Sequence, residues 1–244
     1  MPSVEAGHDP ATAGVGEGPG RAGPILALWV GLMIALRAAL WVTGFEPKAL
    51  ADAVDRGAAR AEASRIGEVG DDVIRKAIQL QRDTLPFWAT LARLGDFAVE
   101  PAALMIRALA VATLFAAVAA LTGRSVNFSN GLVESAKIQG FWVFGLAVRV
   151  ALVIALRRED IETSLAVLLP PGTHPAATVL LARQVDPCAL IGWGALAWRG
   201  WRRGQANLAT AIVLCGFLAI SEAIVRVSCG LIVGAGMRLS ILPD

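Results

Sequence analysis

The sequence has no tyrosine, two histidines and three cysteines among its 244 residues, and these shortages exclude several classes of protein. Three cysteines are too few for the disulfide framework of a small secreted domain. His8 lies in a glycine-rich stretch and His174 in a proline-rich turn, so neither predicts a metal or tetrapyrrole site. No phosphate-binding loop, G-x-S-x-G or H-E-x-x-H motif occurs. We therefore expect no catalytic residue, no metal and no cofactor, and interpret the chain as a non-enzyme.

Charged residues are also scarce, at 17% of the chain against about 25% in a typical soluble domain. Hydrophobic residues make up 56%, and the mean hydropathy is +0.61. The 22 basic and 20 acidic side chains nearly balance, and a net charge of +2 gives no argument for nucleic-acid binding. The seven tryptophans are of a residue type enriched at membrane interfaces. This composition predicts an integral membrane protein whose first partner is the lipid bilayer.

Five apolar segments predict membrane-spanning helices, and they run over 24–44, 101–123, 134–158, 187–204 and 207–238. The last is roughly 45 Å long as a helix, so it must tilt, kink or extend beyond the bilayer. The segment from Pro187 is short for a full crossing, and its start is expected below the membrane surface. A cleaved signal peptide is the alternative for the first segment, but Arg37 interrupts the run and favours an uncleaved anchor.

The predicted fold is an all-α polytopic membrane helical bundle of about five transmembrane helices. Residues 1–22 form a disordered N-terminal tail. Residues 23–45 hold the first transmembrane helix, 46–97 form a charged and amphipathic helical loop, and 98–244 form a four-span bundle. Two predicted spans, 101–123 and 134–158, separate the loop 46–97 from the loop 157–185. Because the number of crossings is even, we expect both loops on the same side of the membrane.

The first loop has a better-patterned second half. Residues 71–94 predict one helix with apolar side chains tending to one side and basic ones to the other. This pattern fits an amphipathic helix that lies on the membrane surface. A soluble helical hairpin packed on the rest of the protein is the alternative. Lysines and arginines are divided almost evenly between the two possible sides, so the membrane orientation stays open.

Charges inside the apolar segments form the candidate site. Glu222 and Arg226 lie four residues apart, so on a helix they share one face. An unpaired charge at the bilayer centre costs roughly 2.5–3.5 kcal/mol, and we therefore expect this pair to face other helices. Glu222 is the only carboxylate predicted deep in a span. The other candidates are Arg37, Arg107, Arg149 and, at the start of the short span, Asp186.

Two interpretations of these charges stay open. They form either an interhelical clamp that fixes helix packing or a site for an ion, a proton or an anionic lipid. Proton relays usually need more than one intramembrane carboxylate, which favours the clamp. Gly230 and Gly234 form a G-x-x-x-G pattern that predicts close helix packing.

The second half, about 101–236, resembles the Yip1-domain family of polytopic membrane proteins. "LTGRSVNFSNGLVESAKIQGFW" is similar to the Gly-Arg, then Phe-containing, link between two spans in prokaryotic members. "LARQVDPCALIGWGALAWRG" resembles the Asp-led D-x-F-x-x-W entry to a later span, with Pro187-Cys188 in place of the usual aromatic-rich step. The resemblance implies a five-span α-helical bundle, no known catalysis and, in eukaryotes, vesicle trafficking with Rab-type GTPases. The eukaryotic D-L-Y-G-P signature is absent, so GTPase binding is not carried over.

Two functions follow from the sequence. The first is a non-enzymatic scaffold or accessory subunit of a membrane assembly in the bacterial inner (cytoplasmic) membrane, with other membrane proteins as partners. The second, motivated by the buried arginines, is a small transporter or lipid-handling permease.

Overall fold

The structure, a computed structural model, describes residues 21–65, 71–125, 127–158, 161–169 and 174–239. Every regular element in these ranges is helical, which confirms the predicted all-α helical bundle. Four helices among them are long and apolar enough to cross a membrane: Ala22–Val42, Leu85–Leu121, Phe128–Leu156 and Leu208–Ala235. The chain is therefore a membrane protein. The predicted tail, 1–22, lies almost entirely outside the described residues.

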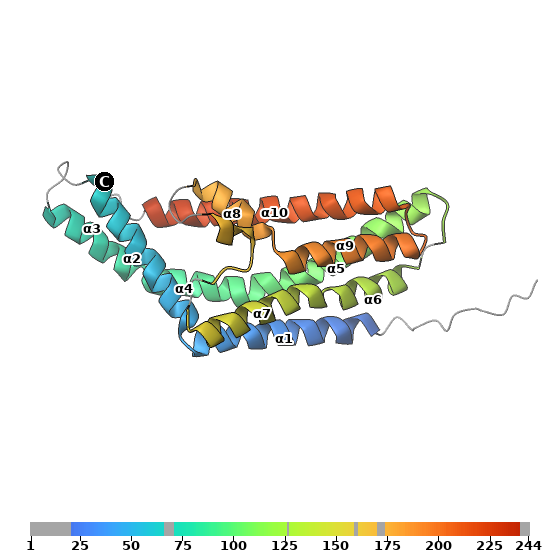
Figure 1. Ribbon diagram of the computed structural model, residues 1–244, viewed down its shortest axis with the longest axis horizontal. Coiled ribbons are helices and arrows are strands. Elements are labelled where there is room, and N and C mark those ends of the chain that lie inside the picture. Colours follow the sequence, from blue (N-terminus) through green and yellow to red (C-terminus); the bar gives the residue numbers. More distant parts are fainter. Residues whose placement is uncertain (1–20, 66–70, 126, 159–160, 170–173, 240–244) are drawn as a thin grey trace, which may run out of the picture.

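The chain runs back and forth along the bundle (Figure 1). α1 (Ala22–Val42) makes the first pass, and α4 (Leu85–Leu94), the π-helical turn η2 (Gly95–Val99) and α5 (Glu100–Leu121) make the second. α6 (Phe128–Ile138) and α7 (Gly140–Leu156) make the third, and α10 (Leu208–Leu239) makes the last. Four of the five predicted spans therefore correspond to long helical passes.

Helices α2 (Phe45–Arg65) and α3 (Asp71–Asp83) pack on each other and project from one end of the bundle, called here the hairpin end (Figure 1). An exposed ion pair joins them, with Arg82 Nη2 3.0 Å from Asp55 Oδ1. Ile161, which follows the third pass, packs against the cluster of Leu40, Val150 and Val153 at this same end. The chain after the first pass and the chain after the third pass therefore leave the bundle at the same end, and their shared side of the membrane stays a prediction. The side chains of the predicted apolar face of α3 lie largely outside the described part.

The prediction of a single helix over 71–94 was wrong. α3 ends at Asp83, and a separate helix begins at Leu85 and continues into the second pass. Pro86 explains the break, because proline is accommodated in the first turn of a helix and disrupts one that continues through it. The second spanning helix has 37 residues, so at about 1.5 Å per residue it is longer than the roughly 30 Å hydrocarbon layer.

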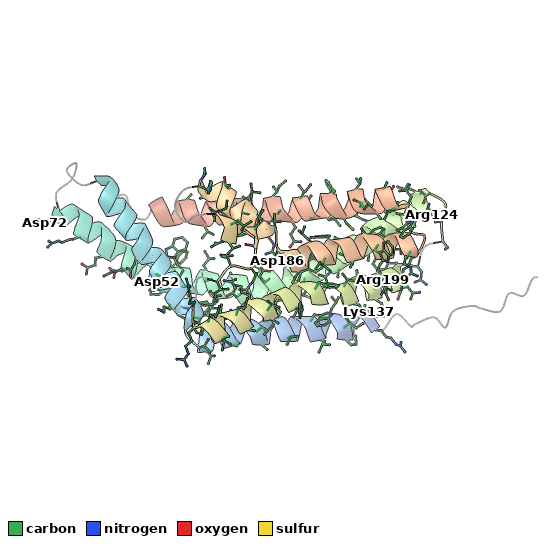
Figure 2. The ribbon with its side chains drawn as sticks, viewed as in Figure 1. Asp52, Asp72, Arg124, Lys137, Asp186 and Arg199 are labelled. Carbon is green, nitrogen blue, oxygen red and sulfur yellow. The ribbon has the colours of Figure 1, made fainter. Side chains whose placement is uncertain are left out.

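The fourth pass contains a short helix, α9 (Pro187–Arg202). Its 16 residues span only about 24 Å. Asp186 caps it by accepting hydrogen bonds from the backbone N–H groups of Cys188 and Ala189 at 2.8 and 3.1 Å. Pro187 is the first residue of the helix, because proline is disfavoured in the interior of a helix. Figure 2 shows Asp186 midway along the bundle and Arg199 at the end opposite the hairpin, called here the far end. The 3₁₀ turn η3 (Leu165–Leu168) and the short α8 (Ala176–Gln184) complete this pass.

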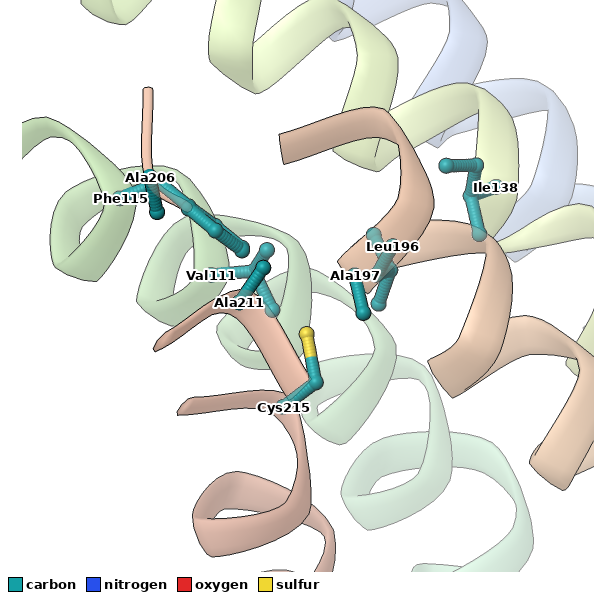
Figure 3. Packing of buried hydrophobic residues seen from close by; sticks show 8 residues of the cluster. All are labelled: Val111, Phe115, Ile138, Leu196, Ala197, Ala206, Ala211 and Cys215. Carbon is teal, nitrogen blue, oxygen red and sulfur yellow. The ribbon is translucent and has the colours of Figure 1, made fainter. Parts of the chain in front are cut away.

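The largest apolar core cluster lies where α5, α6, α9 and α10 meet (Figure 3). Its buried members are Val111, Phe115, Ile138, Leu196, Ala197, Ala206, Ala211 and Cys215. The outward faces of the long helices are apolar as well, with exposed Leu28, Leu109, Phe144 and Phe217. In a membrane-spanning bundle such faces contact lipid.

Glycines allow α9 to approach its neighbours closely. A Cβ on Gly192 would lie 2.6 Å from the ring of Trp142 in α7, and one on Gly200 would overlap the ring of Phe115 in α5. The predicted G-x-x-x-G pattern has a smaller role. A Cβ on Gly230 would come 3.2 Å from Leu180 of α8, whereas one on Gly234 would have no described atom within 4 Å. The short α8 covers α10 at only one of these two glycines.

Substitution of Gly200 by alanine should destabilise the protein by about 1–3 kcal/mol, the usual cost of overpacking a close contact. Gly194 is a matched control on the same helix, because a Cβ there meets no described atom within 4 Å. Gly194→Ala should be neutral or stabilising, since alanine favours helix by up to about 1 kcal/mol. Thermal unfolding of both variants in detergent compares them. Equal stability would show that Phe115 does not hold α9 at this distance.

Candidate functional site: intramembrane charges and their cavity

Four charged residues from the second pass and α10 form one connected network. Arg107 Nε and Nη2 donate to the two carboxylate oxygens of Glu222 at 2.8 and 2.5 Å. Arg226 Nε donates to Glu222 Oε1 at 2.9 Å, as the spacing of four residues predicts. The other two nitrogens of Arg226 donate to Glu100 at 2.6 and 3.0 Å. The network holds two positive and two negative charges, so it is neutral as a unit.

Arg107 is the most enclosed member of this network, with 5% of its surface exposed. Its remaining nitrogen, Nη1, donates to Gln139 Oε1 at 2.9 Å, and Gln139 is fully buried where α6 meets α7. The guanidinium also lies over the ring of Trp142, 4.2 Å from its centroid. Each of its three nitrogens therefore has an acceptor. This arrangement explains how an arginine is accommodated inside an apolar helix.

Arg37 belongs to a separate group near the hairpin end. Its Nη1 lies 3.0 Å from Asp96 Oδ1 and 4.0 Å from Glu46 Oε1. The indole N–H of Trp41 donates to the other oxygen of Asp96 at 2.8 Å. This group fastens α1 to η2, the π-helical turn that presents Asp96.

Asp96, Glu100 and Gln139 were not among the predicted site residues. The second span was predicted to begin at Pro101, so Asp96 was placed in the first loop and Glu100 just ahead of the span, and Glu222 was wrongly taken as the only deep carboxylate. Their spacing carried a signal, because Asp96, Glu100 and Arg107 are separated by four and seven residues and so share one face of a continuous helix.

A cavity of about 390 Å³ lies beside this network, bounded by α1, α5, α7, α10 and the first turns of α9. Because α9 begins only in the middle of the bundle, this helix does not fill the space before its N-terminus. Five arginines line the cavity: Arg37, Arg107, Arg149, Arg183 and Arg226. Four carboxylates also line it: Glu100, Glu162, Asp186 and Glu222.

Four of these five arginines have a carboxylate partner. Besides the pairs above, Arg183 Nη2 lies 2.6 Å from Glu162 Oε1. Arg149 differs, because its Nε is buried without a hydrogen-bond partner, and none of its nitrogens forms an ion pair among the described residues. It is thus the one cavity arginine without a counter-charge in the part of the chain that the structure describes.

Asp186 was predicted to belong to the site formed by the intramembrane charges, and in the structure it forms no ion pair with the described arginines. Its Oδ1 caps α9, and its Oδ2 accepts the hydroxyl of Thr163 at 3.1 Å. Asp186 lies against Gly145, one helical turn before Arg149, yet forms no ion pair with it. The positive end of the α9 dipole stabilises the charge of Asp186, and Arg149 is left without an ion-pair partner among the described residues.

Searches against protein-family models, curated proteins and solved structures find no match for this chain. The resemblance to the Yip1-domain family therefore stays a prediction. Among the described residues, no group of three or more His, Cys, Asp or Glu side chains could hold a metal ion. The positively charged donors that line the cavity are all guanidinium groups, which bind carboxylates and phosphates.

Proposed function

We propose that the protein binds a molecule with a carboxylate or phosphate group in the cavity at Arg149, as a small transporter or lipid-handling permease. The observation that carries the proposal is the missing ion-pair partner of Arg149, whose Nε is buried without an acceptor. A guanidinium offers two parallel N–H donors to a carboxylate or phosphate, and the resulting charge-assisted bonds are strong in a low-dielectric site.

The surroundings of Arg149 support an organic anion. A volume of about 390 Å³ lies in the roughly 300–1,000 Å³ range of small-molecule sites. Leu146, Leu190 and Trp193 add apolar walls beside the charged ones. The neighbouring arginines are already paired with carboxylates, whereas Arg149 forms no ion pair among the described residues. An ionisable residue in a membrane interior that faces a cavity is typical of a substrate or ion pathway.

We further propose a multi-pass location in the bacterial inner membrane, which the resemblance to prokaryotic Yip1-like proteins supports. A scaffold or accessory subunit is the other function predicted from the sequence. It requires no ligand in the cavity, so a binding experiment separates the two.

The experiment measures the thermal stability of the purified protein during titration with butyrate, inorganic phosphate and phosphatidic acid. At least one of these anions should raise the melting temperature saturably. Arg149→Gln should weaken that binding about 10- to 100-fold, because a hydrogen bond to a charged group contributes about 1.5–3 kcal/mol. The exposed Arg82 lies outside the cavity, so Arg82→Gln is the control and should bind as the parent does. Absence of saturable stabilisation by all three anions would favour the scaffold.

A further inference from the structure

The far end of the bundle carries a cluster of positively charged side chains that do not line the cavity. Residues 121–137 and 198–208 contain five basic side chains and one carboxylate, Glu134. The basic patch consists of Arg124, Lys137, Arg199, Arg202 and Arg203, all exposed. Figure 2 shows Arg124, Lys137 and Arg199 together at this end, away from Asp186 in the middle of the bundle.

Glu134 organises this patch and neutralises only one of its charges. Its carboxylate is buried and lies 3.1 Å from Lys137 Nζ, 3.0 Å from Arg203 Nη2 and 3.5 Å from Arg199 Nη1. These cations come from α6 and from the end of α9, so one acidic group draws three positive groups from two helices to one place. The surplus charge of the patch is therefore held in a fixed arrangement.

Backbone contacts fix two further parts of the patch. Arg124 Nη1 donates to the carbonyl of Gly204 at 2.8 Å, and Arg203 Nη1 donates to that of Asn130 at 3.1 Å. The first bond ties the link between α5 and α6 to the link between α9 and α10, and the second ties the end of α9 to the first turn of α6. Arg202 has no such contact among the described residues, and its exposed guanidinium is available to an anion.

Two indoles accompany the charges. Trp198 and Trp201 lie edge to face with ring centroids 4.8 Å apart, and 50% and 37% of their surfaces are exposed. They stand on the same turns of α9 as Arg199 and Arg202. Exposed tryptophans at a helix end are typical of the headgroup level of a membrane, where the ring contacts acyl chains and the N–H faces water. Exposed Leu121 and Leu208 continue the apolar surface toward the lipid.

We propose that the basic patch, together with Trp198 and Trp201, binds the phosphate of an anionic phospholipid in the adjacent leaflet. Arginine pairs with phosphate oxygens in bidentate geometry, and each basic residue near an anionic membrane surface contributes an attraction of about 1 kcal/mol, a factor of roughly five in affinity. The indoles distinguish this ligand from free phosphate, because a lipid brings acyl chains for them to contact. The site is independent of the cavity at Arg149.

Native mass spectrometry of the full-length protein, titrated with phosphatidylglycerol, phosphatidylcholine or inorganic phosphate, tests this proposal. Phosphatidylglycerol should bind more tightly than phosphatidylcholine, and inorganic phosphate should not displace it at equal concentration. Arg199→Gln with Arg202→Gln should weaken phosphatidylglycerol binding about 25-fold and leave phosphatidylcholine binding unchanged. Arg202→Gln alone should weaken it about fivefold without loss of stability, because Arg202 has no described partner.

The matched control removes two exposed arginines from the hairpin end, Arg82→Gln with Arg93→Gln, and should bind phosphatidylglycerol as the parent does. Equal affinity of the parent for the two lipids would overturn the proposal. So would an equal loss of affinity in the hairpin-end control, or displacement of the lipid by equimolar phosphate, which would identify a site for the free anion.

Discussion

Replacement of Glu222 by glutamine should destabilise the protein by about 3–5 kcal/mol, because it leaves Arg107 inside the bundle without a counter-charge. Glu222 accepts from Arg107 through both carboxylate oxygens, whereas Arg226 keeps two bonds to Glu100. The loss therefore falls on Arg107. Asp55→Asn is the matched control, since its ion pair with Arg82 is exposed and should contribute about 1 kcal/mol or less. Denaturation in detergent measures both.

Paired substitutions identify which residues act as a unit. Arg107→Met with Glu222→Met removes one positive and one negative charge and leaves the Arg226–Glu100 pair intact, so it should be much milder than Glu222→Gln alone. Glu222→Met with Arg226→Met strands Arg107 and Glu100, so it should be at least as damaging as Glu222→Gln. The reverse order of these two double variants would contradict the network and would make the pair within α10 the unit.

The first and last membrane-spanning helices could be predicted from the sequence, because the length of an apolar segment is enough to identify such a helix. The first and last predicted segments, 24–44 and 207–238, lie within two residues of α1 and α10. The second pass was predicted too short, because Arg93, Asp96 and Glu100 lower the hydropathy of 85–100. In the structure each of these side chains contacts a partner: Arg93 lies over Trp41, Asp96 pairs with Arg37 and Glu100 pairs with Arg226. Hydropathy counts such residues as polar even where their charges are compensated.

The candidate site was predictable only in part, for a related reason. Spacing along one helix predicts the contact between Glu222 and Arg226. The stronger contacts of these residues join positions separated by 115 and 126 residues, and no local pattern reports those. The cavity exists because α9 begins in the middle of the bundle, and Asp186 and Pro187 indicate that start in the sequence. Which arginine lacks a partner in the cavity is decided by the packing of the helices alone. Arg107 and Arg149 cannot be told apart in sequence, although one is fully bonded and the other is not.

This difference predicts opposite effects for one substitution at the two arginines. Arg107→Met should destabilise the protein by about 3–5 kcal/mol, because it leaves two partly buried carboxylates, Glu100 and Glu222, with the single cation Arg226.

Arg149→Met should instead raise the stability of the ligand-free protein, by up to about 2–3 kcal/mol, because it replaces a cation that has no ion-pair partner among the described residues with an apolar side chain of similar length. The same variant should lose the stabilisation by anions that the parent shows. A gain in stability combined with a loss of binding is typical of a residue kept for function rather than for folding. Melting temperatures of the parent and both methionine variants, each with and without the anion, measure these effects. Destabilisation of Arg149→Met comparable to that of Arg107→Met would show that Arg149 supports the fold through partners of its own, and the cavity would lose its candidate ligand-binding residue.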